Sequence, residues 1–171
     1  AHVFARYMQF FCFAGNVSLG LSSNLKTILA DFKAFKPTFI LAVPRIFEKI
    51  YNAASQKAGA GFKGRVFADA TQTSYDWSHA QQSGGSIPLA LNAKHALYNK
   101  LVYSSIMEVF GGHVEYAVSG GAPLDSSIAH FFNGVGLPLL EGYGMTETCA
   151  PSSVNPTEGY KIGTIGLPLQ G

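Results

Sequence analysis

Apolar residues along the chain switch between helical spacing and short continuous runs, which is the pattern of an α/β domain. Six stretches carry helical spacing: Ala1–Gly15, Leu25–Phe35, Pro44–Ala54, Val66–Trp77, Pro88–Phe110 and Asp125–Phe132. Four stretches suit strands: Asn16–Gly20, Phe39–Val43, His113–Val118 and Leu137–Leu140. Because strands and helices alternate, the sequence predicts a partial doubly wound, mostly parallel sheet flanked by helices.

The same pattern predicts where side chains are buried. Aromatic residues recur at three- and four-residue steps between Phe4 and Phe13, which predicts a buried first helix. Phe39–Val43 is apolar throughout, as expected of a strand covered on both faces. Gln, Ser and Gly between His79 and Ser86 predict a surface loop, and repeated Pro and Gly after Thr148 predict little regular structure.

Composition favours part of a larger protein. The 171 residues suffice for one domain with a core, yet 47% are hydrophobic and only 13% charged, which is apolar for a free-standing soluble protein. The net charge of +2 comes without a basic run, which argues against nucleic acid as a partner. Cys12 and Cys149 lack metal spacing and fit a reduced cytoplasmic compartment. No apolar run is long enough to span a bilayer, so any membrane contact would be peripheral.

Candidate chemistry concentrates in Leu139–Thr148, where an apolar run gives way to glycines, a tyrosine and polar side chains. The Tyr143 ring can cover the face of an adenine, and the glycines beside it let the main chain approach closely. Thr146 offers a hydroxyl to a phosphate, and Glu147 offers the oxygen that Mg²⁺ prefers when phosphates share the metal. Taken singly, each of these residues also fits a polar turn after a core strand.

The ordered set resembles a known family. Glu141-Gly142-Tyr143-Gly144-Met145-Thr146-Glu147 is similar to the Tyr-Gly-x-Thr-Glu motif of the adenylate-forming, or AMP-binding, superfamily, which holds acyl-CoA synthetases, luciferases and peptide-synthetase adenylation domains. Ser119–Leu124 looks like the glycine-rich loop on the adenine side of the same family. Val43–Ile50 and the helical region before Ser119 resemble its long-chain fatty acyl-CoA synthetase branch, so the resemblance covers most of the chain.

The resemblance implies a role for each matched residue. Glu147 would hold Mg²⁺ and, with Thr146, carry the catalysis. The nucleotide would be bound by Gly120, Gly121, Ala122, Pro123, Glu141, Gly142, Tyr143, Gly144, Met145 and Thr146. Gly144 and Met145 would also lie near the acyl carboxylate, and His2 would line the entry to the acyl pocket. Some long-chain members place an aromatic gate where this chain has Arg6, which departs from that pattern.

The resemblance also implies an activity. A long-chain fatty acid would react with ATP to give an acyl-AMP, and CoA would then take the acyl group, in a cytoplasmic enzyme. Peripheral contact with a membrane and assembly as a homodimer are both compatible with this reading. Residues 1–171 show no counterpart of the family's phosphate loop or of its small C-terminal domain with the catalytic lysine. We therefore expect a fragment of the large domain, inactive on its own.

Other readings stay open at this point. A fatty acyl-AMP ligase that loads a carrier protein shares the motifs, and a non-catalytic paralogue could bind lipid or nucleotide without needing Tyr143, Thr146 and Glu147. A serine hydrolase would need a Gly-x-Ser-x-Gly elbow, which the sequence lacks. Gly59–Gly64 matches Gly-x-Gly-x-x-Gly but follows a helix, so we expect a helix break and not a dinucleotide site.

Overall fold

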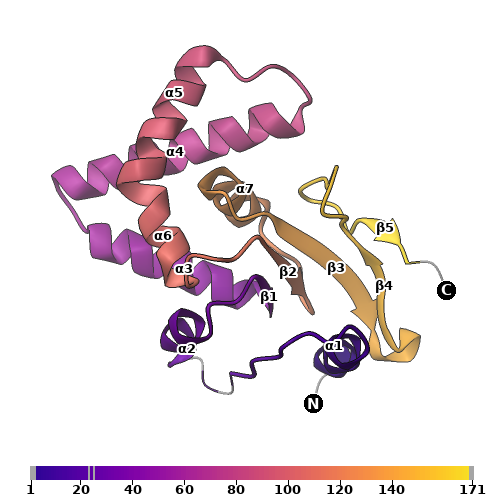
Figure 1. Ribbon diagram of the computed structural model, residues 1–171. Helices are drawn as coiled ribbons and strands as arrows, with labels where there is room; N and C mark the ends of the chain where they lie inside the picture. The colour runs from indigo at the N-terminus through magenta and orange to yellow at the C-terminus, as the bar shows by residue number, and fades with distance from the viewer. Residues whose placement is uncertain (1–2, 23, 25, 170–171) are drawn as a thin grey trace.

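A computed structural model describes residues 3–22, 24 and 26–169. Within these residues five strands form one sheet in the order β1-β2-β3-β4-β5. The strands are β1 (Phe39–Ala42), β2 (Tyr116–Gly120), β3 (Leu139–Met145), β4 (Ala150–Val154) and β5 (Leu167–Pro168). β1, β2 and β3 run parallel, while β4 and β5 are antiparallel additions (Figure 1). The predicted α/β class with a mostly parallel sheet is confirmed.

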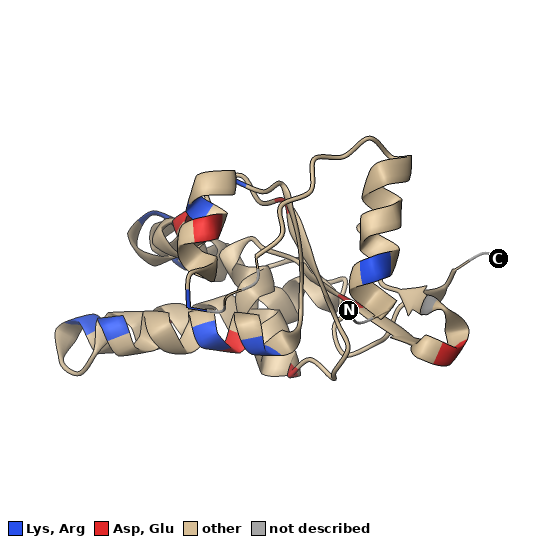
Figure 2. Cartoon of the chain, turned by 90° about the horizontal axis from the view of Figure 1, so that it is seen from below, with Lys and Arg blue, Asp and Glu red and all other residues tan. Residues whose placement is uncertain are grey.

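The helices are distributed unequally over the two faces of the sheet. They are α1 (Val3–Ala14), α2 (Ile28–Phe35), α3 (Pro44–Ala58), α4 (Phe62–Gln82), α5 (Leu89–Tyr98), α6 (Ser104–Val109) and α7 (Ser126–Val135). A π-helical turn (Asn99–Tyr103) joins α5 to α6, so the predicted long helix after Pro88 forms as a continuous helical segment with a π-helical interruption. Figure 2 shows α1, beside the marked N-terminus, across the sheet from the other helices.

Local sequence explains the helix ends near the parallel strands. Pro44 occupies the first turn of α3, where its missing N–H costs no hydrogen bond. Asp125 caps α7 as predicted, because its carboxylate accepts from the Ser127 N–H at 2.7 Å. The Ser127 hydroxyl donates to the same carboxylate and, with that N–H, holds the pKa of Asp125 below its usual value. Gly136 ends α7 with a φ of 100°, a left-handed conformation that favours glycine.

The core lies between the parallel strands and α3 to α7. Its fully covered side chains include Phe47, Tyr103, Phe110, Phe132 and Leu137, each 0% exposed. Helices α4 and α7 pack closely at Gly134, where an added Cβ would stand 2.3 Å from the Ser74 carbonyl oxygen. A buried polar network crosses the same interface: the Ser78 hydroxyl lies 2.8 Å from His130 Nδ1 and accepts from the Asn133 amide at 2.8 Å.

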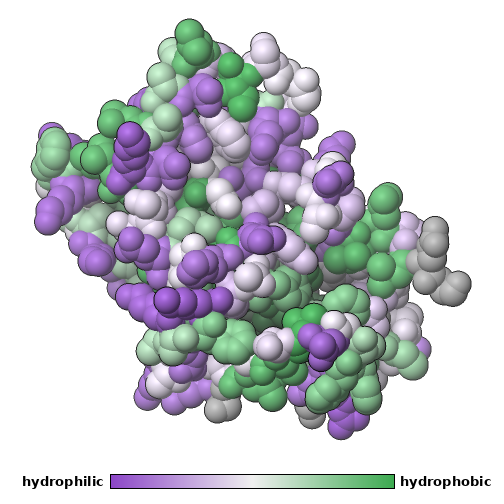
Figure 3. Space-filling model, in the orientation of Figure 1, coloured by the Kyte–Doolittle hydropathy of each residue, from purple (hydrophilic) through white to green (hydrophobic). Residues whose placement is uncertain are grey.

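The first helix forms as predicted, but it is not buried. In α1 only Cys12 is buried, whereas Phe10, Phe11 and Phe13 are 73%, 57% and 78% exposed. Figure 3 shows apolar atoms gathered over the position of α1 at the lower edge of the view. Apolar spacing indicates that a helix face needs covering, yet it does not say which segment covers it. The burial prediction is therefore wrong for the residues described.

Four expectations about strands and loops also need correction. Asn16–Gly20 forms no strand, because no neighbouring segment pairs with it. In β1 only Ile40 is buried, since this strand lies at the edge of the described sheet. Helix α4 continues to Gln82, so the expected loop His79–Ser86 is partly helical. Strands β4 and β5 form where little regular structure was predicted, since antiparallel pairing depends on main-chain hydrogen bonds and not on an apolar pattern.

Candidate functional site

Parallel pairing of β2 with β3 brings the two predicted motifs together. Ser119 pairs with Glu141, and Gly120 pairs with Gly142, so the loop after β2 begins beside the second half of β3. Figure 1 shows the two strands side by side at the centre of the sheet. The sequence predicted that both segments would lie at one sheet edge if their strands were parallel neighbours, and that arrangement is confirmed.

The tyrosine motif is carried by the strand itself and not by a loop. β3 continues to Met145, and its side chains pass from buried at Leu139 to exposed from Tyr143 onward. Tyr143 is 46% exposed and Met145 is 43% exposed, so both are accessible to a ligand. Thr146 and Glu147 follow as exposed residues of a short 3₁₀ turn, η2 (Thr146–Thr148).

Thr148 holds this turn in place. Its hydroxyl oxygen accepts from the Met145 N–H at 3.1 Å and from the Ser152 hydroxyl at 3.1 Å, which ties the turn to β4. Cys149 closes the turn in a left-handed conformation with φ 60°, and its N–H donates to the Thr146 carbonyl at 3.1 Å. The side chains of Thr146 and Glu147 are thereby presented at the tip of the β3–β4 hairpin, where Figure 2 shows an acidic position.

A small cavity lies where the two motifs meet α1. Its lining residues are Val3, Phe4, Gly121, Gly142, Tyr143, Gly144 and Pro151. Four predicted nucleotide-binding residues therefore share one hollow. Its volume is about 20 Å³, whereas small-molecule sites typically measure roughly 300–1,000 Å³. Five other predicted site residues are exposed and adjoin the lining residues in sequence, but they do not line the cavity: Ala122, Pro123, Met145, Thr146 and Glu147. The described residues thus offer one wall for a nucleotide and do not enclose one.

Phe4 is a residue of this site that the sequence prediction missed. A Cβ added to Gly120 would stand 2.9 Å from Phe4 Cζ and 3.2 Å from the Gly142 carbonyl oxygen. The ring therefore lies directly on Gly120 of β2. Helical spacing identified Phe4 only as one apolar position among several, because spacing cannot tell which aromatic ring faces a glycine.

Glu141 connects the two motifs. One oxygen of its carboxylate accepts from the Leu124 N–H at 3.3 Å, and its main-chain carbonyl accepts from the Asn155 N–H at 2.9 Å. Burial raises the pKa of the Glu141 carboxyl, and the Leu124 N–H offsets part of that rise. The side chain is half-buried between the loop after β2 and the sheet.

Comparison with known proteins identifies the family. The family model described as AMP-binding enzyme matches residues 1–171. The chain belongs to the AMP-binding enzyme family. It is 45% identical over its whole length to the long-chain-fatty-acid–CoA ligase FadD15 of Mycobacterium bovis and 44% identical to FadD15 of Mycobacterium tuberculosis. It is 32% identical over 99% of its length to long chain acyl-CoA synthetase 3 of Arabidopsis thaliana. The chain spans 28% of each mycobacterial relative and 25% of the plant one.

The AMP-binding chain offers a single carboxylate at the expected metal position. In the described part of the chain no cluster of three or more His, Cys, Asp or Glu could hold a metal ion. Glu147 alone still fits Mg²⁺, since this ion is commonly held by one or two carboxylates together with substrate phosphates and water. Thr146 stands beside it with an exposed hydroxyl. The donors present therefore suit a metal shared with a nucleotide and not a protein-only cage.

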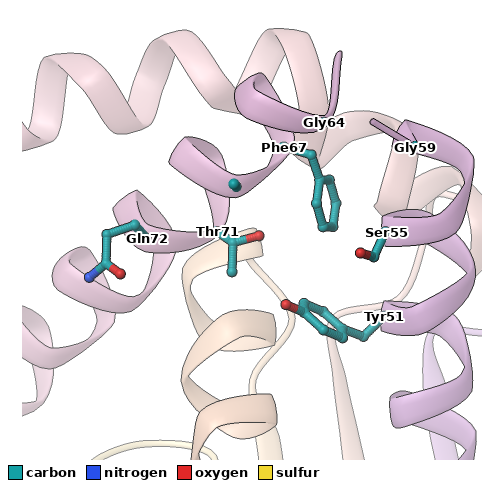
Figure 4. A pocket seen from close by; sticks show the side chains of 8 residues that line it. Tyr51, Ser55, Gly59, Gly64, Phe67, Thr71 and Gln72 are labelled. Atoms are coloured by element: carbon teal, nitrogen blue, oxygen red, sulfur yellow. The ribbon is translucent and has the colours of Figure 1, made fainter. Parts of the chain in front are cut away.

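A second cavity of the AMP-binding chain, larger than the one at the motifs, lies away from them. It occupies about 230 Å³ between α3 and α4 and is lined by Tyr51, Ser55, Gly59, Gly64, Phe67, Ala68, Thr71 and Gln72. Figure 4 shows Tyr51 and Ser55 facing Phe67 and Thr71 across the gap, with Gln72 pointing away. The buried Thr71 hydroxyl finds no hydrogen-bond partner among the described residues. None of the predicted site residues contributes to this hollow.

The remaining predictions concern features outside the two motifs. His2, predicted to line the acyl entry, lies outside the described residues. Arg6 is exposed on α1, and it lines neither of the two cavities. The first half of Gly59–Gly64 forms the turn between α3 and α4, and the second half begins α4, which confirms the predicted helix break. Among the described residues no helix is long and apolar enough to cross a membrane.

Proposed function

We propose that the full-length parent is a long-chain fatty acid–CoA ligase that forms an acyl-AMP intermediate. The observation that carries the proposal is the pairing of β2 with β3, which sets the Gly120–Pro123 loop beside the Glu141–Thr146 segment. Residues matching both nucleotide motifs of the family thus border one another, while three relatives are named as long-chain synthetases or ligases. We infer the same substrates, a fatty acid, ATP and CoA, for this protein.

The proposed reaction has two steps. A carboxylate oxygen of the fatty acid attacks the α-phosphorus of ATP, the bond to the bridging oxygen breaks, and pyrophosphate leaves. The CoA sulfur then attacks the acyl carbonyl carbon, AMP leaves, and the thiol proton is released to solvent or a base. Both steps place negative charge on phosphate oxygens, so fixed donors and cations that stabilise this charge accelerate them.

The motif match and the exposure of these side chains support the role proposed for each residue. The half-exposed Tyr143 ring covers one face of adenine, and the Gly121–Pro123 main chain forms the opposite wall. Thr146 donates its hydroxyl to the α-phosphate. Glu147 holds Mg²⁺, which when bound withdraws charge from the phosphate oxygens. Gly144 and Met145 border the acyl carboxylate.

The proposed parent is larger than this chain. We infer that residues 1–171 form part of its large domain, since the described cavity at the motifs measures only about 20 Å³. The phosphate loop, the acyl pocket and the catalytic lysine would come from other parts of the protein. We further infer a cytoplasmic enzyme, with peripheral membrane contact suited to an amphiphilic substrate. The isolated segment is expected to form no acyl-AMP, and measurable formation would contradict this assignment.

The deciding experiment measures pyrophosphate release by the full-length parent with ATP, Mg²⁺ and acids from acetate to palmitate, with and without CoA. We expect release to peak with long chains and to yield a CoA thioester. Accumulation of acyl-AMP without thioester would favour a carrier-loading ligase, and no release with any acid would favour a non-catalytic binding protein.

Two variants test the assigned roles. Glu147→Ala should abolish the response of adenylation to Mg²⁺, so an unchanged Mg²⁺ dependence would contradict the metal role. Tyr143→Ala should chiefly weaken ATP binding, by about 5- to 150-fold if the loss resembles that of an aromatic stacking contact of roughly 1–3 kcal/mol. Glu158→Ala, which removes an exposed carboxylate outside both motifs, serves as the matched control.

A further inference from the structure

We propose that Glu141 is a positioning residue whose carboxylate fixes the distance between the Gly121–Pro123 loop and β3. This inference rests on the proposed function, because it concerns the loop assigned there to the adenine. It adds a role that direct contact with a nucleotide does not supply: the side chain sets the shape of the site before any ligand arrives.

The loop after β2 has few other restraints. Regular pairing with β3 ends at Gly120 and Gly142. The Asp125 cap begins only where α7 starts. Between these points the 3.3 Å bond from the Leu124 N–H to the Glu141 carboxylate is, among the described residues, the one hydrogen bond that reaches positions 121–124. Gly121, with φ 82°, and the exposed Ala122 and Pro123 therefore depend on packing contacts apart from this bond.

Glu141 is itself rigidly placed. It sits in the middle of β3, paired with Ser119 of β2 on one side. Its carbonyl accepts from the Asn155 N–H at 2.9 Å on the other side. Asn155 is 5% exposed, and its amide donates to the Thr164 carbonyl at 2.6 Å, which anchors the segment after β4. The carboxylate therefore extends from a backbone that both neighbouring segments fix.

Half-burial strengthens the contact that this carboxylate makes. A hydrogen bond from a main-chain N–H to a carboxylate is stronger than one between neutral groups, and partial exclusion of water strengthens it further. The Leu124 side chain is buried at 8% exposure, so the loop is drawn onto the core just where it meets α7. Release of the bond frees the loop without removing any ring or cation from the nucleotide.

The first test follows the contact directly in the full-length parent. Hydrogen exchange of the segment that contains the Leu124 amide should be slow in the wild type and faster in Glu141→Ala. Glu141→Gln keeps an oxygen acceptor of the same length, so most of the protection should return. Glu115→Gln, which changes an exposed carboxylate outside both nucleotide motifs, is the matched control and should leave the exchange unchanged. Unaltered exchange in Glu141→Ala would overturn the proposal.

The second test separates positioning from charge. Glu141→Ala should raise the KM for ATP by about 10- to 150-fold, the loss expected for one hydrogen bond to a charged group, and should lower kcat less. Glu141→Gln should recover most of that loss, whereas equal impairment of both variants would mean that the charge matters and not the acceptor. If the parent shows no ligase activity, AMP binding by calorimetry replaces KM. The exchange experiment tests the hydrogen bond between Leu124 and Glu141 by itself. A failure of the proposed function therefore remains distinct from a failure of the positioning role.

Discussion

The contact between Phe4 and Gly120 can be tested by adding one methyl group. Gly120→Ala places a Cβ 2.9 Å from Phe4 Cζ, 3.2 Å from Phe4 Cε1 and 3.2 Å from the Gly142 carbonyl oxygen. Ordinary carbon–carbon contacts lie at roughly 3.5–4.0 Å. Gly120 is not among the described glycines with positive φ, so alanine meets no backbone strain there. The whole effect of the substitution is therefore steric, and most of it falls on the Phe4 ring.

The expected magnitude follows from this overlap. Overpacking of a filled site by one methyl group typically costs about 1–3 kcal/mol. If α1 and the ring shift to relieve the contact, the wall beside Gly142 and Tyr143 shifts with them. At 1.4 kcal/mol for each factor of ten, pyrophosphate release at subsaturating ATP should fall by about 5- to 150-fold. Gly85→Ala, where the nearest atom would lie 4.0 Å away, is the matched glycine control.

A double-mutant cycle identifies the ring as the cause. Phe4→Ala removes the atoms that the new methyl group meets, so the double variant should be impaired at least fivefold less than the product of the two single effects. That difference corresponds to a coupling of about 1 kcal/mol, the size expected of residues in contact. Effects that simply multiply would show that Phe4 does not lie on Gly120 in the working enzyme.

Three further predictions concern the helical layer. Gly134→Ala should destabilise the protein by about 3 kcal/mol, measured by thermal unfolding, because the new Cβ would lie 2.3 Å from the Ser74 carbonyl oxygen. Thr71→Val should raise stability by roughly 1 kcal/mol, because it removes a buried hydroxyl without a partner among the described residues. Burial, helped by stacked His79, lowers the pKa of His130 below its ordinary 6.5. The unfolded chain therefore binds this proton more readily, and denaturant unfolding should show stability falling as pH drops below 6.5, then levelling beneath the folded pKa.

A matched control variant for each of these three predictions separates the stated cause from the effect of a similar substitution elsewhere. Asn52→Ala also raises helix propensity, on an exposed face of α3 where the remaining methyl group meets no clash, and should be neutral or mildly stabilising. Thr73→Val removes a buried hydroxyl that does donate, to the Asp69 carbonyl at 2.7 Å, and should destabilise where Thr71→Val does not. His113→Gln, at an exposed site, should leave the pH dependence intact, whereas His130→Gln should flatten it. A destabilised Thr71→Val would indicate a water or ligand bound in the adjoining cavity.

The sequence predicted the parallel part of this fold well, for a physical reason. Continuous apolar runs mark strands of a sheet flanked by helices, and Phe39–Val43 and Leu137–Leu140 supply such runs. The existence and order of these strands could therefore be derived, although the burial of β1 could not. The cap at Asp125 was equally local, because an acidic residue before a helix satisfies the first N–H groups wherever that helix packs. The adjacency of the two motifs followed from topology once both strands were parallel.

What could not be predicted depends on contacts between distant segments. β4 begins at Ala150 and contains Pro151 and two serines, so no apolar alternation marks it, and only its pairing with β3 makes it a strand. The contact of Phe4 with Gly120 joins positions 116 residues apart and leaves no local pattern. The hydrogen bond of the Glu141 carboxylate likewise depends on the Leu124 main-chain N–H, which the sequence does not distinguish from any other N–H.

The exposed rings of α1 suggest how the rest of the large domain could affect the proposed nucleotide site. This helix carries Phe4 against the glycines of the site, yet Phe10, Phe11 and Phe13 on the same helix are more than half exposed. A contiguous apolar surface of this kind is rarely left in water by a soluble protein, so we expect the rest of the large domain to cover it. Whatever covers these three rings also fixes the axis of α1, and through it the position of Phe4 on Gly120. The nucleotide wall would then reach its final geometry only when the distant part of the domain has docked, which gives a structural reason to expect no acyl-AMP formation by the isolated segment even though its motifs are intact.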